Sequence, residues 1–595
     1  MRLGVVEMVQ SSQSEYKVVV EKDVPGQTRD GVTLYADVYR PDATGRFPVL
    51  LSRLPYDKNL RARPGDIDYF VERGYVVIMQ DTRGRFASEG DEYYPPFYEI
   101  QDGYDAVEWA AALPYSDGKV GTMGQSYLGA TQYLLSPTRP PHLRASFPVS
   151  AAADFYQCWV YHTGGAFELG WQIPYAILMA RDSLQRQGLT DTLLPALERD
   201  LAEAHIAFAQ PLTDAAYRRL PLMDWADLLK PVARYLGDYL KHPDDGPYWW
   251  PVNLERQHAN VSVPMYHVTS WYDIFLRGGL ANFSGLRQQA MTEDARTHQK
   301  LLVGPWAHRF PYTSPSSGDA GDIDFGDHAR IELHKTQLRW FDYWLKGMDT
   351  DILNDAPVKL FVMGENVWRD EQEWPLARTR YTPYYLHSQG QANSLNGDGS
   401  LSPVAPGEEP PDRFVYDPND PVPSGGGNTL IIPMGVQDQR PIEARPDVLV
   451  YTTEPVSEPV EVTGPIAVEL YAATSTPDTD FTAKLVDVRP DGYAQNLADG
   501  IIRLRYRDSR SRPVLATPGE IYALSIDLWA TSHVFFPGHR IRVEIASSNF
   551  PRFDRNLNTG ADQATTTQVQ PAQQTVFHDA RYPSHILLPL IPRSA

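Results

Sequence analysis

Residues 120–129 read Val-Gly-Thr-Met-Gly-Gln-Ser-Tyr-Leu-Gly, and this stretch decides the fold. An apolar run ends at Gly124, Ser126 follows two residues later, and a helical pattern begins after Gly129. A serine on a sharp strand-to-helix turn projects from the end of the strand, and small neighbours relieve the strained backbone there. The stretch therefore predicts an exposed nucleophilic hydroxyl, although many strand–helix turns carry glycine and serine for geometry alone. It also departs from the plain Gly-x-Ser-x-Gly pattern, because Leu128 stands where the second glycine is usual.

A serine nucleophile needs a base and an acid that orients the base, and in α/β-hydrolases these follow in the order serine, acid, histidine. The apolar run 263–268 reads as a strand and is followed by Asp273, whereas the run 301–307 is followed directly by His308. Functional groups of open α/β sheets gather at these carboxyl ends of strands. We therefore expect a triad of Ser126, Asp273 and His308. His267 lies inside the first run and is interpreted as a core histidine bonded to a backbone group.

The reaction also requires donors for the negative charge that develops on the substrate oxygen. The backbone N–H of Tyr127, directly after the nucleophile, is the first candidate. The second is expected from the loop 54–58, which follows the predicted strand 48–53 and contains no glycine run. Tyr56 in this loop offers its phenolic O–H, although an aromatic side chain packed at a strand end is the alternative interpretation.

The organisation of the chain predicts an α/β fold in four segments. Strands and helices alternate over residues 1–150, which we interpret as the first part of an α/β-hydrolase domain. Residues 151–255 are helical and interrupt the rhythm, as a cap over the active site would. The α/β pattern resumes over 256–356. Residues 357–595 read as many short strands with Pro, Gly, Asn and Asp turns, which predicts a β-sandwich.

Composition restricts the partners and the compartment. The 595 residues carry 75 acids and 54 bases, and the formal net charge is −21. This charge disfavours nucleic acid and anionic membrane surfaces as partners. Cys158 is the one cysteine, which excludes an intramolecular disulfide, and we interpret it as a buried thiol rather than a nucleophile. Residues 1–7 lack the apolar run of a signal peptide and no stretch is long enough to span a membrane, so we expect a cytoplasmic protein.

No metal or cofactor is expected. His328 and His334 are six residues apart on a predicted helix and therefore do not share one face. The acidic positions 478, 480 and 487 lack the dense oxygen spacing of a calcium loop. The first strand is not followed by the glycine fingerprint of a dinucleotide site.

Motifs along nearly the whole chain resemble those of the bacterial cocaine esterase family, whose relatives include α-amino-acid ester hydrolases and X-prolyl dipeptidyl peptidases. The matching segments are Arg29–Leu34, Tyr39–Pro41, Pro55–Lys58, Gln80–Gly90, Gly124–Gly129, Trp271–Asp273, Gly304–His308, Phe361–Gly364, Thr479–Leu485 and Ser548–Pro551. The resemblance implies a jelly-roll β-domain at the carboxyl end and self-association as a homodimer through that domain. It assigns the nucleophile to Ser126, the acid to Asp273, the base to His308, and the oxyanion tyrosine to Tyr56.

The resemblance also bears on the substrate. In the amino-acid ester hydrolases of this family, acidic residues shortly after the triad aspartate hold a substrate ammonium. Here residues 274–277 are Ile-Phe-Leu-Arg, which argues for an uncharged acyl group. The resemblance places an aromatic or bulky apolar acyl group in a pocket whose matching residues are Phe275, Trp171, Trp159, Ile431 and Ile432. Plain core packing is the alternative interpretation for each of these side chains.

The sequence therefore predicts a serine carboxylesterase acting on a small-molecule ester. Two alternatives stay open. One is an amidase or acylase with the same triad, which matched ester and amide substrates would separate. The other is a non-catalytic ligand-binding relative, which a serine-directed phosphonate would not label.

Overall fold

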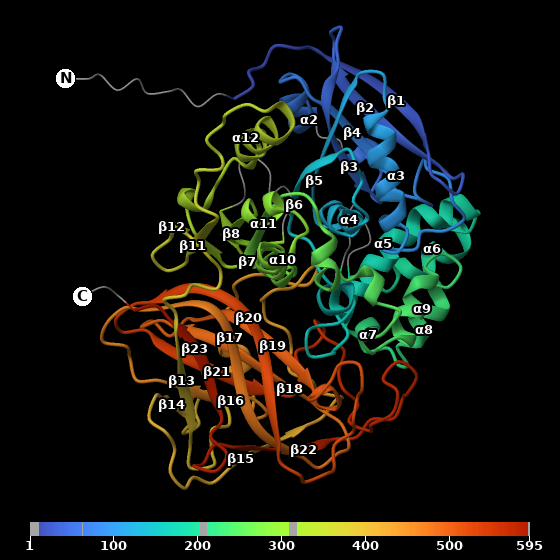
Figure 1. The fold of residues 1–595 in the computed structure, drawn as a ribbon. Coiled ribbons are helices and arrows are strands. Elements are labelled where there is room, and N and C mark those ends of the chain that lie inside the picture. Colours follow the sequence, from blue (N-terminus) through green and yellow to red (C-terminus); the bar gives the residue numbers. More distant parts are fainter. Residues whose placement is uncertain (1–10, 62–63, 203–210, 309–317, 593–595) are drawn as a thin grey trace, which may run out of the picture.

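A computed structural model of the chain describes residues 11–61, 64–202, 211–308 and 318–592. It has an α/β-hydrolase domain with an inserted helical cap, followed by a β-sandwich that lies beneath the hydrolase domain in Figure 1. Among the described residues, no helix is long and apolar enough to cross a membrane.

The hydrolase domain is built on one ten-stranded sheet. In spatial order its strands are β1 (Val18–Gln27), β2 (Thr33–Pro41), β4 (Val76–Asp81), β3 (Phe47–Leu54), β5 (Ser116–Gln125), β6 (Leu143–Val149), β7 (Tyr266–Tyr272), β8 (Lys300–Ala307), β11 (Val358–Val362) and β12 (Val367–Glu371). From β4 to β11 neighbouring strands run parallel, whereas the pairs at both ends of the sheet are antiparallel. The parallel strands place their carboxyl ends along one edge of the sheet, where side chains from different loops can meet.

Helices cover both faces of this sheet because its central strands are apolar on both sides. On β3, Val49 and Leu51 face the core beneath α3 (Glu99–Ala111) and α4 (Tyr127–Leu135), whereas Leu50 faces α2 (Pro64–Val71) and α12 (Leu333–Lys346). This alternation follows from the two-residue period of a strand. The other elements of this domain are the helix α10 (Leu276–Gln289) and the short elements α1 (Lys58–Arg61), η1 (Ser136–Thr138), α11 (Glu293–Thr297), β9 (Asp319–Ala320), β10 (Ile323–Asp324) and η5 (Asp327–Ala329).

The segment between β6 and β7 is helical, as the sequence predicts for the cap. Its elements are η2 (Tyr156–Val160), α5 (Leu169–Gln187), α6 (Thr190–Glu198), α7 (Asp214–Tyr217), α8 (Met223–Leu229), α9 (Arg234–Lys241), η3 (Trp250–Val252) and η4 (Leu254–Asn260). Its buried side chains share one hydrophobic core with α3 and α4, so the cap is packed onto the hydrolase sheet.

The β-domain has its own core, formed by residues such as Leu470, Leu485, Ile526 and Ile545. Its strands are β13 (Arg380–His387), β14 (Ser400–Ser402), β15 (Asp412–Tyr416), β16 (Leu449–Thr452), β17 (Val460–Thr474), β18 (Asp480–Val488), β19 (Ala494–Arg503), β20 (Tyr522–Phe535), β21 (Arg540–Ala546), β22 (Ala572–Phe577) and β23 (His585–Leu590), with α13 (Arg440–Glu443) and η6 (Leu504–Tyr506) in the loops. The prediction that every strand after residue 357 belongs to the β-sandwich is wrong for β11 and β12. Strand β11 pairs with β8 and thereby extends the hydrolase sheet.

Candidate active site

The turn between β5 and α4 presents Ser126 as the sequence predicts. Ser126 has a positive φ of 63° and stands directly before the first residue of α4. Gly124 has a φ of 145°, and a Cβ there would lie 2.4 Å from the Cβ of Leu128. A Cβ on Gly129 would lie 2.9 Å from the carbonyl oxygen of Val149 on the neighbouring strand. Both glycines are therefore required for a tight turn that carries a serine in a strained conformation.

The three predicted triad residues meet at the carboxyl edge of the sheet. His308 follows β8, and its Nε2 lies 3.1 Å from the Oγ of Ser126. Its Nδ1 lies 2.8 Å from the Oδ2 of Asp273, which follows β7. Asp273 is fully buried, and its Oδ1 accepts a 2.7 Å hydrogen bond from the backbone N–H of Phe275. The arrangement has the serine–base–acid geometry of a nucleophilic hydrolase site.

A residue of the β-domain completes the support of the acid. The amide Nδ2 of Asn428 donates to the backbone carbonyl of Asp273 at 2.9 Å and to that of Trp271 at 2.7 Å. Sequence reasoning missed Asn428, because it lies far along the chain from Asp273. The glycine run 425–427 beside it was the available signal, since such runs mark a close approach of backbone.

Both predicted oxyanion donors lie close to this turn. Tyr56 follows β3, and its ring packs edge-on against that of Tyr127 at 6.4 Å. The side chain of Tyr127 is fully buried and donates from its hydroxyl to Oε1 of Glu99 at 3.0 Å. Burial raises the pKa of the Glu99 carboxyl, while Arg53, paired with it at 2.5 Å, acts in the opposite direction. This buried pair anchors the ring of Tyr127 and, through it, the residue whose backbone N–H follows the nucleophile.

The predicted acyl-pocket aromatics form one cluster beside the histidine. Phe275 stacks on Trp159 with ring centroids 5.2 Å apart, and its ring meets the His308 imidazole edge-on at 5.3 Å. Trp171 packs edge-on against Trp159 at 4.8 Å. Tyr175, one helical turn after Trp171 on α5, belongs to the same cluster and was not identified from the sequence.

Ile432, one of the two predicted isoleucines of the β-domain, borders this cluster. Ile432 is buried and Ile431 is partly buried, and both pack against the core that contains the aromatic residues. The Cδ1 of Ile432 lies 3.2 Å from the position of a Cβ on Gly170, next to Trp171. Three of the five predicted pocket residues, Phe275, Trp159 and Trp171, thus pack against one another, and Ile432 lies beside them next to Gly170.

The other nucleophilic, basic and acidic side chains considered from the sequence lie outside the triad and have other partners or are buried. His267 is buried as predicted, but its partners are side chains, the hydroxyl of Tyr133 at 2.7 Å and Oε1 of Gln299 at 2.9 Å, and not the backbone. Burial lowers the pKa of His267 to about 4, which keeps it neutral. Burial raises the pKa of the Cys158 thiol to about 12, so it is protonated and unreactive. Asp478 and Asp480 form ion pairs with Arg505 and Arg503, and the carboxylate of Asp487 accepts hydrogen bonds from His533 and His539.

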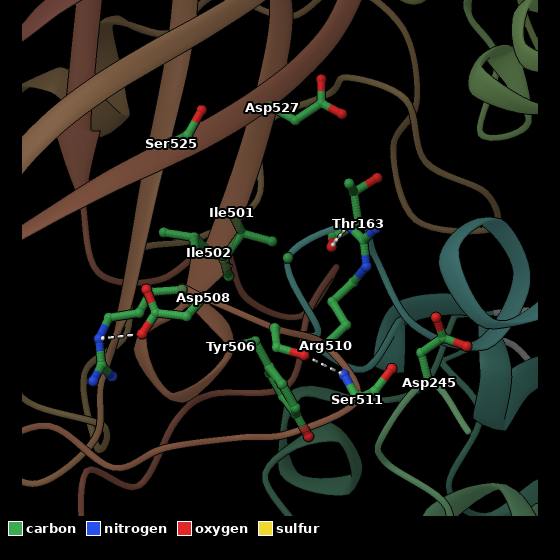
Figure 2. Close-up of a pocket in the computed structure, with 13 residues that line it drawn as sticks. Thr163, Asp245, Ile501, Ile502, Tyr506, Asp508, Arg510, Ser511, Ser525 and Asp527 are labelled. Atoms are coloured by element: carbon green, nitrogen blue, oxygen red, sulfur yellow. Dashed lines mark hydrogen bonds and ion pairs between the residues drawn. The ribbon is translucent and has the colours of Figure 1, made fainter.

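A separate cavity of about 480 Å³ lies where the hydrolase domain meets the β-domain (Figure 2). Thr163 and Asp245 come from the hydrolase side, and Ile501, Arg510 and Asp527 from the β-domain. The Nη1 of Arg510 donates to the carbonyl of Thr163 at 3.2 Å, which joins the two domains across its wall. No triad residue lines this cavity, so it is distinct from the candidate active site.

Comparison with known proteins agrees with this architecture. Residues 30–309 match the X-Pro dipeptidyl-peptidase (S15) family, and residues 351–587 match the X-Pro dipeptidyl-peptidase C-terminal non-catalytic domain. The chain is 41% identical to cocaine esterase of Rhodococcus sp. (strain MB1 Bresler), over 97% of this chain and 99% of that protein.

Solved structures show the same fold. An α-amino acid ester hydrolase superposes with a TM-score of 0.76 at 25% identity, covering 99% of this chain and all of that one. An aminopeptidase from a marine-sediment Thaumarchaeota archaeon superposes with a TM-score of 0.79 at 24% identity, covering 99% of each chain. The chain is therefore a serine hydrolase of the S15 family, with cocaine esterase among its full-length relatives.

Proposed function

We propose that the protein is a serine carboxylesterase that works through an acyl-enzyme. The observation that carries this proposal is the chain of contacts from Ser126 through His308 to Asp273, at 3.1 and 2.8 Å. The likeness to cocaine esterase over the whole chain supports an ester as the substrate.

In the first half-reaction, the Oγ of Ser126 forms a bond to the ester carbonyl carbon and passes its proton to Nε2 of His308. The carbonyl oxygen becomes an oxyanion that accepts hydrogen bonds from the hydroxyl of Tyr56 and the N–H of Tyr127. The bond to the alcohol oxygen then breaks, and the alcohol leaves with the proton from His308. In the second half-reaction, water gives its proton to His308 and attacks the acyl carbon, which releases the acid and restores the Ser126 hydroxyl.

The oxyanion role of Tyr56 predicts a large effect from the loss of one oxygen atom. Tyr56→Phe is expected to lower kcat by roughly 10²- to 10³-fold with little change in KM, because one oxyanion donor acts mainly in the transition state. Steady-state kinetics on p-nitrophenyl benzoate measures this. An unchanged kcat in a folded variant would remove Tyr56 from the proposal.

The aromatic cluster supports an aromatic or bulky apolar acyl group. Residues 274–277 offer no carboxylate to a substrate ammonium, and Arg277 is itself paired with Glu255. Phe275 contacts both Trp159 and His308, so a ring held among these residues would lie beside the reacting carbonyl. The matching apolar surroundings favour a benzoyl group over an ammonium-bearing amino-acyl group.

A benzoyl ester is expected to exceed the matched acetyl ester in kcat/KM by about 10- to 100-fold. Each kcat/KM is first divided by the rate constant for hydrolysis of that ester by hydroxide, which corrects for its intrinsic reactivity. Roughly 100 Å² of additional apolar area at about 25 cal/mol per Å² gives this ratio. Phe275→Leu should reduce the ratio, whereas Phe283→Leu, on the helix that follows Phe275 but in the core beside His267, should leave it unchanged. Equal or better hydrolysis of the acetyl ester would contradict the aromatic assignment.

The amidase alternative is tested with N-benzoyl-p-nitroaniline, which differs from p-nitrophenyl benzoate in the bond that is cleaved. The esterase proposal expects turnover of the ester and little turnover of the anilide. Comparable kcat/KM values for both substrates would favour the amidase.

A further inference from the structure

Three tyrosine hydroxyls form a chain that begins at the proposed oxyanion donor. The hydroxyl of Tyr56 lies 3.2 Å from that of Tyr175, and the hydroxyl of Tyr175 lies 3.4 Å from that of Tyr93. Tyr56 follows β3, Tyr175 belongs to the cap helix α5, and Tyr93 precedes α3. We refer to Tyr56, Tyr175 and Tyr93 as the tyrosine chain. It connects the hydrolase loop to the cap through side-chain hydroxyls.

Tyr175 and Tyr93, the two members of the tyrosine chain behind Tyr56, are held in fixed positions. The ring of Tyr175 packs edge-on against Trp159 at 5.7 Å and against Trp171 at 5.4 Å. The ring of Tyr93 packs against Tyr127 at 6.2 Å and carries the guanidinium of Arg85 over it at 5.0 Å. Such packing on several sides leaves the rings few alternative rotamers, so the hydroxyls stay aligned.

The hydroxyls of Tyr175 and Tyr93 stay protonated and can therefore donate hydrogen bonds. Tyr175 and Tyr93 are 6% and 3% exposed, and burial raises the pKa of each phenol well above 10. A buried hydroxyl without a partner is costly, which favours keeping both contacts of Tyr175. Each phenol carries one proton, so each can donate only one hydrogen bond while its oxygen accepts others.

The charge of the oxyanion determines which hydroxyl donates to which along the tyrosine chain. When Tyr56 donates to an oxyanion, its own oxygen can still accept the proton of Tyr175, whose oxygen in turn accepts from Tyr93. Hydrogen bonds to a charged acceptor are roughly twice as strong as neutral ones, so the developing charge selects this direction. Hydrogen bonds aligned in one direction polarise and strengthen one another.

We propose that Tyr175 is a positioning residue for the oxyanion. It donates to the oxygen of Tyr56, which directs the Tyr56 proton toward the substrate and makes that proton a stronger donor. Tyr93 supports Tyr175 in the same way. This inference rests on the proposed function, because it needs Tyr56 as an oxyanion donor.

Tyr175→Phe keeps the ring and removes the hydroxyl. We expect kcat for p-nitrophenyl benzoate to fall about 3- to 10-fold, the fold-change of one neutral hydrogen bond, with KM changed less than about two-fold. In the double variant Tyr56→Phe/Tyr175→Phe, kcat should equal that of Tyr56→Phe alone, because Tyr175 acts through the Tyr56 oxygen. Tyr235→Phe is the matched control. Tyr235 is buried against Tyr93 at 5.9 Å, but its hydroxyl has no partner among the described residues, and its loss should leave kcat unchanged.

A second measurement separates positioning from general packing. Phenylboronic acid forms a tetrahedral, charged adduct with a serine nucleophile, whereas benzoate resembles only the acyl group. Tyr175→Phe should weaken inhibition by phenylboronic acid by the same factor as kcat and leave inhibition by benzoate unchanged. Equal weakening of both inhibitors, or multiplied effects in the double variant, would overturn the positioning role.

The outcomes distinguish this inference from the proposed function. If Tyr56→Phe does not change kcat, the oxyanion assignment itself fails. If Tyr56→Phe is slow while Tyr175→Phe matches the natural chain, the esterase proposal stands and the role of Tyr175 is wrong.

Discussion

Replacement of Ser126 by alanine is expected to lower kcat for p-nitrophenyl benzoate by about 10⁴- to 10⁶-fold. The variant keeps the oxyanion donors and the histidine but lacks the oxygen that forms the covalent bond, so only direct attack by water remains. Ser150→Ala is the matched control. Ser150 follows the next strand of the sheet, also has a positive φ, and has a buried hydroxyl without a partner among the described residues.

Steady-state turnover of both variants shows whether Ser126 or another residue is the nucleophile. If Ser126 is the nucleophile, Ser150→Ala turns over normally and Ser126→Ala shows almost no turnover. Equal turnover of Ser126→Ala and the natural chain would place the chemistry at another residue.

The second large effect is expected from Asp273→Asn, which should lower kcat by about 10⁴-fold. The backbone N–H of Phe275 donates to Oδ1 at 2.7 Å and would hold the amide oxygen of an asparagine in that place. The amide nitrogen would then face Nδ1 of His308, which would have to accept a hydrogen bond. The proton of the neutral imidazole would thus move to Nε2, where it prevents proton transfer from the Ser126 hydroxyl.

Asp154→Asn provides the control for this change. Asp154 is equally buried and also accepts a backbone N–H two residues later, but its second oxygen bonds the side chain of Gln157. Its replacement should leave kcat within a few-fold of the natural value. A comparable loss in both variants would mean that Asp273 matters for folding rather than for the tautomer of His308.

The candidate site could be predicted from the sequence where it depends on strand ends. The apolar runs before Ser126, Asp273 and His308 form β5, β7 and β8, and parallel strands bring their carboxyl ends together. Tyr56 follows β3, which is adjacent to β5 in the same sheet. Local pattern and sheet topology were sufficient to place these four residues at one edge of the sheet, while the choice of Tyr56 also needed the family resemblance, and the catalytic roles stay predictions.

The remaining contacts depend on the packing of distant segments, which no local pattern encodes. Asn428 reaches Asp273 from a loop of the β-domain, and Tyr175 reaches Tyr56 from the cap. The prediction that β11 and β12 belong to the β-sandwich was wrong for a related reason. The alternation of apolar and polar residues along a strand is the same whichever sheet the strand joins. The homodimer and the cytoplasmic location stay predictions.

The most direct test of the central claim is the site of covalent modification by a phenyl fluorophosphonate, read by intact mass and peptide mapping. One adduct per chain is expected, located on Ser126, with loss of esterase activity in proportion to labelling. Activity that persists without labelling, or an adduct on another residue that accompanies inactivation, would contradict Ser126 as the nucleophile.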